Sequence, residues 1–281
     1  MIQLFVSDLD GTLLNENHQL DHRILHSIDF VLENQRDFAI ATGRDMHPLH
    51  KKSLDFGDRH IYTICMNGAM VFNWNRHIIF ERPIESSFVF EFAKTFPDLS
   101  FDYNGKLVKY TLASYSAIFA RYHERNFFGG SMNVETMENW LSDYRYDQTP
   151  EAIASQPIYK INGEVDDPQR KAEVYDFLSR HGHQIENAPF RPDFFEITAK
   201  GVNKGMAIHQ LTQYLGLVDD DVAVYGDGGN DMDMMKAFRY SYAPSNASKK
   251  IKSYAYKILG PNSAYSVPIH MEETIIKNKN K

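Results

Sequence analysis

Two carboxylates stand two positions apart near the start of the chain, directly after an apolar run. Asp8 and Asp10 belong to the pentapeptide Asp-Leu-Asp-Gly-Thr at residues 8–12, which follows the apolar residues 2–6. In an extended segment, side chains two positions apart face the same side, so both carboxylates can address one ligand or one metal ion. Asp, Gly and Thr are also common turn residues, and this motif by itself fits a solvated turn equally well.

A second polar motif, Thr42-Gly43-Arg44, follows the apolar run at residues 38–41. A hydroxyl, a glycine backbone and the free amides of a helix that we expect to begin near Asp45 together suit a phosphate group. The alternative is that Thr42 caps this helix and Arg44 is a solvated side chain.

Lys204 stands at the expected first turn of a helix that runs to Leu215, with Asn203 as its cap. A lysine in the first turn opposes the helix dipole, so a nearby anion would explain its position. An ordinary surface lysine is the alternative interpretation.

The apolar run at residues 222–225 leads into Gly-Asp-Gly-Gly-Asn-Asp at residues 226–231. The glycines allow a close approach of the backbone to a ligand, and Asp227, Asn230 and Asp231 offer the hard oxygen ligands that magnesium prefers. Asn230 is alternatively a cap for a helix that begins directly after this loop.

The elements that must position these groups are predicted to form a parallel sheet. Short apolar runs at residues 2–6, 38–41, 61–66 and 222–225 are typical of buried parallel strands, and residues 21–32 show helical spacing between the first two runs. We therefore predict an α/β fold with a doubly wound, mostly parallel, Rossmann-like core sheet. Ligands bind at the carboxyl edge of such sheets, where all four motifs would lie.

The middle of the chain predicts an inserted α+β domain. It is rich in Tyr and Phe, with alternating segments at 101–110 and 158–165, helical patterns at 114–126 and 169–181, and prolines near both junctions. The predicted division is a core domain of residues 1–84 and 191–281 and an inserted domain of residues 85–190.

Composition excludes several classes of protein. The 281 residues carry a formal net charge of −7, which argues against a broad nucleic-acid surface despite the aromatic residues of the inserted domain. The single cysteine, Cys65, excludes an internal disulfide and lies in an apolar run, where a buried strand residue is expected. No signal peptide or membrane-spanning segment is indicated, so we expect a cytoplasmic protein without membrane contact.

The set of motifs, in this order, resembles the four motifs of the haloacid dehalogenase-like superfamily. They stand at residues 8–12, 42–44, 201–205 and 226–231. The long insertion between the second and third motifs, and Asn67-Gly68-Ala69, resemble the large-cap, Cof-type branch, whose members mostly dephosphorylate sugar phosphates, flavin or pyridoxal nucleotides and related metabolites. One departure is Ala243-Pro244-Ser245-Asn246-Ala247, where the branch usually has a glycine just before Asn-Ala.

The resemblance implies a Mg²⁺-dependent phosphatase that works through a phospho-aspartate. Asp8 would be the nucleophile and Asp10 the general acid and base, an acid that dehalogenases of the superfamily lack. Mg²⁺ would be held by the Asp8 side chain, the Asp10 backbone carbonyl and Asp227, with Asp231 orienting a metal-bound water. The phosphoryl oxygens would be bound by Thr42, Gly43, Arg44, Lys204 and Asn230.

The partner implied is a small phosphorylated metabolite, such as a sugar phosphate or a cofactor phosphate, over which the inserted domain would close. We expect a monomer or homodimer. A phosphomutase or phosphotransferase on the same fold remains an alternative. A non-catalytic ligand-binding module is another, although it would be expected to lose some of Asp8, Asp10, Lys204 and Asp227, and all four are present.

Overall fold

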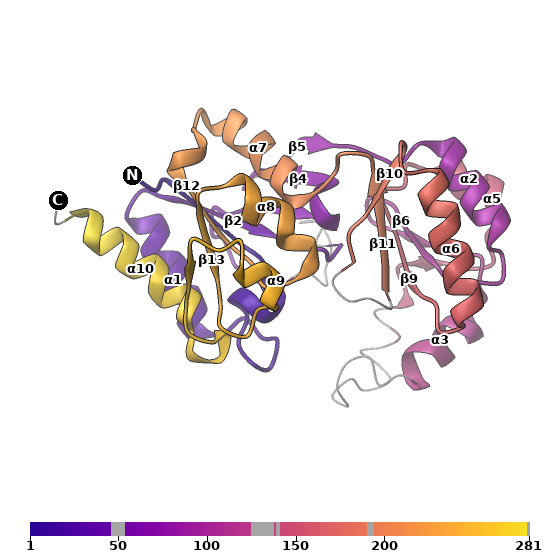
Figure 1. Ribbon diagram of the computed structural model, residues 1–281, viewed down its shortest axis with the longest axis horizontal. Helices are drawn as coiled ribbons and strands as arrows, with labels where there is room; N and C mark the ends of the chain where they lie inside the picture. Colours follow the sequence, from indigo (N-terminus) through magenta and orange to yellow (C-terminus); the bar gives the residue numbers. More distant parts are fainter. Residues whose placement is uncertain (46–53, 125–137, 139–140, 190–193, 280–281) are drawn as a thin grey trace. The chain divides into compact units, whose positions relative to one another are not determined.

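The computed structural model describes residues 1–45, 54–124, 138, 141–189 and 194–279 (Figure 1). The chain forms two compact units: Met1–Glu81 with Gly201–Lys281, and Arg82–Lys200. The expected junctions were 84/85 and 190/191. The second junction lies later because β11 (Phe194–Ala199) pairs with β9 (Lys160–Glu164) and β10 (Ile185–Asn187) in the sheet of the second unit.

The first unit is built on a mixed sheet that is parallel over most of its width. Among the described residues its strand order is β14-β13-β12-β1-β2-β3-β4-β5. The strands from β14 to β3 are parallel, and β4 and β5 add an antiparallel edge. This confirms the predicted fold class. The strands are β1 (Leu4–Ser7), β2 (Asp37–Ala41), β3 (Tyr62–Cys65), β4 (Met70–Phe72), β5 (Ile78–Glu81), β12 (Val222–Tyr225), β13 (Tyr240–Ala243) and β14 (Lys257–Ile258).

The helices of the first unit begin where their capping residues predict. Asp21 accepts hydrogen bonds from the backbone of the first turn of α1 (His22–Glu33), and Asn203 does the same for α7 (Lys204–Leu215). The other helices are α8 (Met232–Ala237), α9 (Lys249–Lys252) and α10 (Ser266–Lys279), the last of which packs beside α1 (Figure 1). The helix expected near Asp45 falls on residues outside those described.

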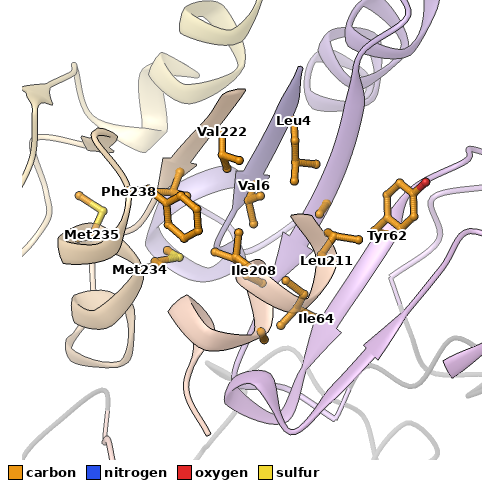
Figure 2. Packing of buried hydrophobic residues seen from close by; sticks show 14 of the residues in the cluster. Leu4, Val6, Tyr62, Ile64, Ile208, Leu211, Val222, Met234, Met235 and Phe238 are labelled. Carbon is orange, nitrogen blue, oxygen red and sulfur yellow. The ribbon is translucent and has the colours of Figure 1, made fainter. Parts of the chain in front are cut away.

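The apolar face of the central strands packs against α7 and α8. Leu4 and Val6 of β1 lie in one cluster with Ile208 of α7, Met234 of α8 and Phe238, which directly follows α8 (Figure 2). Because strand side chains alternate, residues two apart on β1 face this cluster together. The core therefore fixes β1, β12 and both helices, whose ends carry the motif residues.

The second unit has its own sheet, with strand order β10-β11-β9-β6-β7-β8 among the described residues. The expected strand at 101–110 is a hairpin, because Gly105 donates to the carbonyl of Val108 between β6 (Asp102–Asn104) and β7 (Lys109–Tyr110). The other elements among its described residues are β8 (Tyr144–Arg145), α2 (Ser86–Thr95), α3 (Tyr115–Glu124), α5 (Pro150–Ala154) and α6 (Pro168–Arg180).

Aromatic side chains form the core of the second unit. The ring of Phe92 lies at centroid distances of 5.1, 5.0 and 5.7 Å from those of Phe96, Phe101 and Phe177, and the rings of Phe96 and Phe177 are 5.4 Å apart. These aromatics are used for packing, and Tyr103 is fully buried with them. No helix in the described part of the chain combines the length and the apolar character needed to cross a membrane.

Candidate active site

Neighbouring strands bring the first and last motifs together. β1 and β12 pair in parallel with Ser7 opposite Tyr225, and the backbone N–H of Asp8 donates to the carbonyl of Tyr225 at 2.9 Å. The loops that leave these strands at residues 8–12 and 226–231 therefore begin side by side at the carboxyl edge of the sheet. This is the position where open α/β sheets bind ligands.

Lys204 is the centre of a buried charge cluster. Its Nζ donates to Asp8 Oδ1 at 2.7 Å and to Asp231 Oδ1 at 2.6 Å, and its side chain is fully buried. Burial by itself lowers the pKa of Lys204, but the two carboxylates outweigh it and the pKa is raised. The alternative of an ordinary surface lysine is thus wrong. The two carboxylates are the anions that explain a lysine in the first turn of α7.

Asp227 reaches the same cluster and is held by Thr12. The hydroxyl of Thr12 donates to Asp227 Oδ1 at 2.7 Å. Burial is the main cause that raises the pKa of Asp227 to about 6, and the charge of Asp231 adds to it. Gly11 is required for this approach, because a Cβ at Gly11 would lie 2.5 Å from Asp227 Oδ2.

The carboxylate of Asp231 organises the loop around it. Its Oδ2 accepts hydrogen bonds from the backbone N–H groups of Asp227 and Gly228, at 2.9 and 2.8 Å. Asp8 is buried as well. Burial raises the pKa of Asp8 well above its usual value; Lys204 opposes this, whereas Asp231 and Asp227 add to it.

The cluster has the composition of a divalent-cation site. Oxygen atoms of Asp8, Asp227 and Asp231 lie within 4.8 Å of one another. Three carboxylates face one lysine here, so when all of them are ionised the cluster carries surplus negative charge in a buried place. Carboxylate oxygens are the hard ligands that Mg²⁺ and Ca²⁺ prefer. The residues therefore fit the magnesium ion that the motifs predict.

The carboxylate of Asp10 is paired with Arg44. It accepts two hydrogen bonds from Arg44, Nε to Oδ2 at 2.8 Å and Nη2 to Oδ1 at 2.5 Å. His18 Nδ1 lies 3.2 Å from the same Oδ1. Such a fork of two bonds fixes the plane of the carboxylate. The structure thus pairs Arg44 with Asp10, and the prediction that Arg44 binds phosphate stays a prediction.

The remaining predicted phosphate ligands follow β2 and β12, the two strands that flank β1. Thr42 is buried at the end of β2, and its Oγ1 accepts from the backbone N–H of Arg44 at 3.1 Å, with Gly43 between them. Asn230 donates through Nδ2 to Asn67 Oδ1 at 3.1 Å. No side-chain cap bond from Asn230 is found at the start of α8 among the described residues, so the capping alternative is not supported.

Sequence reasoning assigned no role to three residues that the structure places at this edge. Thr12 holds Asp227, His18 approaches Asp10, and Asn67 accepts from Asn230. The Asn246 amide also donates to the carbonyl of Gly11 at 2.7 Å, which ties the segment that departs from the family pattern to the first motif. Thr12 and Asn67 carried a signal, since Thr12 belongs to the first motif and the tripeptide of Asn67 resembles the branch.

The comparisons with known proteins agree with this geometry. A family model described as haloacid dehalogenase-like hydrolase matches residues 5–268. The chain belongs to this family. The hydrolase class predicted from the motifs, an enzyme of the phosphatase type, is confirmed by this membership and by relatives that are named phosphatases.

Two relatives of the family cover almost the whole chain. An HMP-PP phosphatase of Escherichia coli O6:H1 is 27% identical over 264 residues, which is 90% of this chain and 88% of the relative. A 5-amino-6-(5-phospho-D-ribitylamino)uracil phosphatase of Bacillus subtilis is 24% identical over 280 residues, or 96% of each chain.

Solved structures of the family confirm the fold. A haloacid dehalogenase-like hydrolase from B. subtilis has a TM-score of 0.79 at 20% identity, and the match covers 96% of this chain and 99% of that one. A HAD subclass IIB sugar phosphatase has a TM-score of 0.74 at 18% identity, with 97% and 98% covered. Both matches extend through the second unit as well as the first.

Proposed function

We propose that this protein is a Mg²⁺-dependent phosphatase that hydrolyses small phosphorylated metabolites through a phospho-aspartate at Asp8. One observation carries the proposal. Asp8 is a buried carboxylate at the carboxyl edge of the sheet, bonded to Lys204 at 2.7 Å, with Asp227 and Asp231 in the same cluster. Family membership places hydrolase chemistry in this chain, and the cluster offers both a nucleophile and a cation site.

In the first step, an oxygen of Asp8 attacks phosphorus and forms an acyl phosphate while the bond from phosphorus to the ester oxygen breaks. Asp10 gives its proton to that leaving oxygen. The covalent intermediate divides one difficult displacement into two easier ones. Arg44 binds the ionised form of Asp10 and fixes its plane, and this ionised form is the base of the second step.

In the second step, Asp10 takes a proton from water, the water oxygen bonds to phosphorus, and the bond to Asp8 breaks. Inorganic phosphate leaves and Asp8 is restored. Lys204, Thr42, Gly43 and Asn230 bind the phosphoryl oxygens, whose negative charge is the main obstacle to attack by a carboxylate. Lys204 is suited to this because it is buried and already bonded to Asp8.

Asp8, Asp227 and Asp231, with the backbone carbonyl of Asp10, would hold the magnesium ion. When bound, Mg²⁺ supplies positive charge between the nucleophile and the phosphate. The chain prepares for it through Thr12 and the backbone of the 226–231 loop, which fix Asp227 and Asp231.

The substrate class rests on the relatives. They are named an HMP-PP phosphatase, a 5-amino-6-(5-phospho-D-ribitylamino)uracil phosphatase and a sugar phosphatase, and the matches cover at least 88% of each of these proteins. We therefore propose a small phosphate ester as substrate, used in the cytoplasm, and neither a phosphoprotein nor a nucleic acid.

The test is release of free phosphate with and without Mg²⁺ from a panel of sugar phosphates, cofactor phosphates, a phosphopeptide and a 5′-phosphorylated oligonucleotide. We expect Mg²⁺-dependent release from at least one metabolite. Phosphoryl transfer to a sugar without free phosphate would favour the phosphomutase alternative. Higher kcat/KM for either macromolecule than for every metabolite would refute the substrate class.

A further inference from the structure

Asn67 combines two unusual features. Its side chain is buried, 2% exposed, and its Nδ2 has no hydrogen-bond partner among the described residues. Its backbone is left-handed, with φ 56°, between Met66 at φ 51° and Gly68 at φ 101°. Buried amide donors are nearly always paired, and non-glycine residues held in left-handed conformations gather at ligand sites.

The backbone of this turn is tied to the second motif. Met66 N–H donates to the carbonyl of Arg44 at 2.9 Å, and Asn67 N–H donates to the carbonyl of Thr42 at 3.1 Å. On its other side the turn touches the start of α7, because a Cβ at Gly68 would lie 2.4 Å from the carbonyl oxygen of Asn203. The turn that contains Asn67 is therefore held between the segment of Thr42 and the start of α7, where Lys204 lies.

One polar atom of the Asn67 side chain is hydrogen-bonded and the other is not. Oδ1 accepts from Asn230 Nδ2 at 3.1 Å, which leaves Nδ2 as a donor. Its neighbours Thr42 and Asn230 are two of the groups proposed above to bind phosphoryl oxygens. An open donor among such groups is complementary to an anionic oxygen.

We propose that Asn67 is a further phosphoryl-binding residue, whose Nδ2 donates a hydrogen bond to a non-bridging oxygen of the transferring phosphoryl group. This inference rests on the proposed function, since it takes the phosphoryl group to be bound beside Asp8. A neutral amide stabilises the charge that develops on that oxygen without adding a charge that would compete with Mg²⁺ for the carboxylates.

Two variants separate direct binding from a purely structural role. Asn67→Gly removes the amide but tolerates the left-handed backbone. Asn67→Asp keeps the shape and the acceptor for Asn230, but replaces the donor with a carboxylate oxygen. Arg76→Gly is the control, because Arg76 also has a positive φ of 64° and lies in the exposed turn between β4 and β5. For each, we would measure kcat/KM, the inhibition constant or Kd of inorganic phosphate, Mg²⁺ affinity without phosphate, and urea unfolding.

Direct binding predicts that Asn67→Gly lowers kcat/KM by about 100-fold and weakens phosphate binding in parallel, with Mg²⁺ affinity unchanged. Asn67→Asp should be impaired more than Asn67→Gly, and Arg76→Gly should match the wild type. If Asn67→Asp binds phosphate as well as the wild type does, Asn67 only positions Asn230 and the inference is wrong. Unchanged phosphate affinity in both variants would also overturn it.

The phosphate measurement also separates this inference from the proposed function. Wild-type protein that hydrolyses no ester, but whose phosphate affinity falls in both variants, would refute the proposed function and support the role of Asn67. If both variants hydrolyse an ester as well as the wild type does, the proposed function is supported and the role of Asn67 is refuted. Wild-type protein that binds no phosphate in the presence of Mg²⁺ would overturn the inference.

Discussion

Each unit of this protein buries a lysine against carboxylates, and the two sites differ in charge balance. In the second unit, Lys160 donates to Glu196 at 3.1 Å, one cation to one anion, both almost fully buried. In the first unit, Lys204 faces Asp8 and Asp231, with Asp227 beside them. The charges of such a pair cancel, whereas a surplus of carboxylates calls for a cation from outside. Function is therefore expected where the charges do not balance.

The largest effect on turnover should come from the cluster in which three carboxylates surround Lys204. Asp8→Asn replaces the nucleophile with an amide, and we expect turnover to fall at least about a thousandfold while the free energy of unfolding does not decrease, since one crowded charge is removed. Steady-state kinetics and urea unfolding check this. Turnover within about tenfold of the wild type would contradict the assignment of Asp8.

Asp10→Asn should separate proton transfer from metal binding. We expect turnover to fall by about 10²- to 10⁴-fold, because the general acid and base is lost. Mg²⁺ affinity should stay close to that of the wild type, since only the backbone carbonyl of Asp10 is proposed as a ligand. Titration calorimetry with Mg²⁺ measures this, and a large loss of affinity would count against the proposed role.

The balanced pair of the second unit should instead matter for stability. Lys160→Met leaves the buried carboxylate of Glu196 without its cation, and we expect a loss of about 3 kcal/mol in the free energy of unfolding. The matched control is the double variant Lys160→Met/Glu196→Leu, which should recover most of that loss. A single variant that unfolds within about 1 kcal/mol of the wild type would show that this pair contributes little.

Mg²⁺ should stabilise the protein in a pH-dependent way. At pH 7 and free Mg²⁺ of 100 times Kd, we expect about 2.7 kcal/mol of added stability. Burial and Asp231 raise the pKa of Asp227 from 3.8 to about 6. Above pH 6 the charged Asp227 therefore destabilises the metal-free protein. This destabilisation is relieved as the pH falls and Asp227 takes up a proton. The thermal shift caused by Mg²⁺ should therefore shrink below pH 6. An equal shift at pH 5 and pH 7.5, or the wild-type shift in Asp227→Asn, would be inconsistent with the site.

A buried histidine should give the smallest effect. His270 contacts Tyr225 OH at 3.0 Å, and burial, together with Lys257, lowers the pKa of His270 from 6.5 to about 4. Its folded pKa lies below the unfolded value, so stability is lost as pH falls from 6.5 toward 4, by about 2 kcal/mol at pH 5. The difference in urea stability between the wild type and His270→Gln isolates this contribution. A difference that is constant between pH 7 and pH 5 would show that His270 does not titrate in this way.

Much of the first unit could be predicted because its signals are local. The run at 222–225 and the helix from Lys204 to Leu215 match β12 and α7 at both ends, since strand hydrophobicity and an Asn cap act over a few residues. The boundary of the second unit was harder. Strand β11 is apolar like the core strands, and only its antiparallel pairing with β9 and β10 assigns it to the second sheet.

The sequence by itself identified the residues that we propose carry the chemistry: Asp8 and Asp10 after one strand, Lys204 at a helix start, and Asp227 and Asp231 after another strand. Only the tertiary structure decided how they pair. Lys204 meets Asp8 across 196 positions of sequence, and Thr12 meets Asp227 across 215. No local periodicity encodes such contacts, because they depend on the order of the strands and on the packing of α7 against the sheet. The same is true of the bond between Arg44 and Asp10, and of the open donor of Asn67.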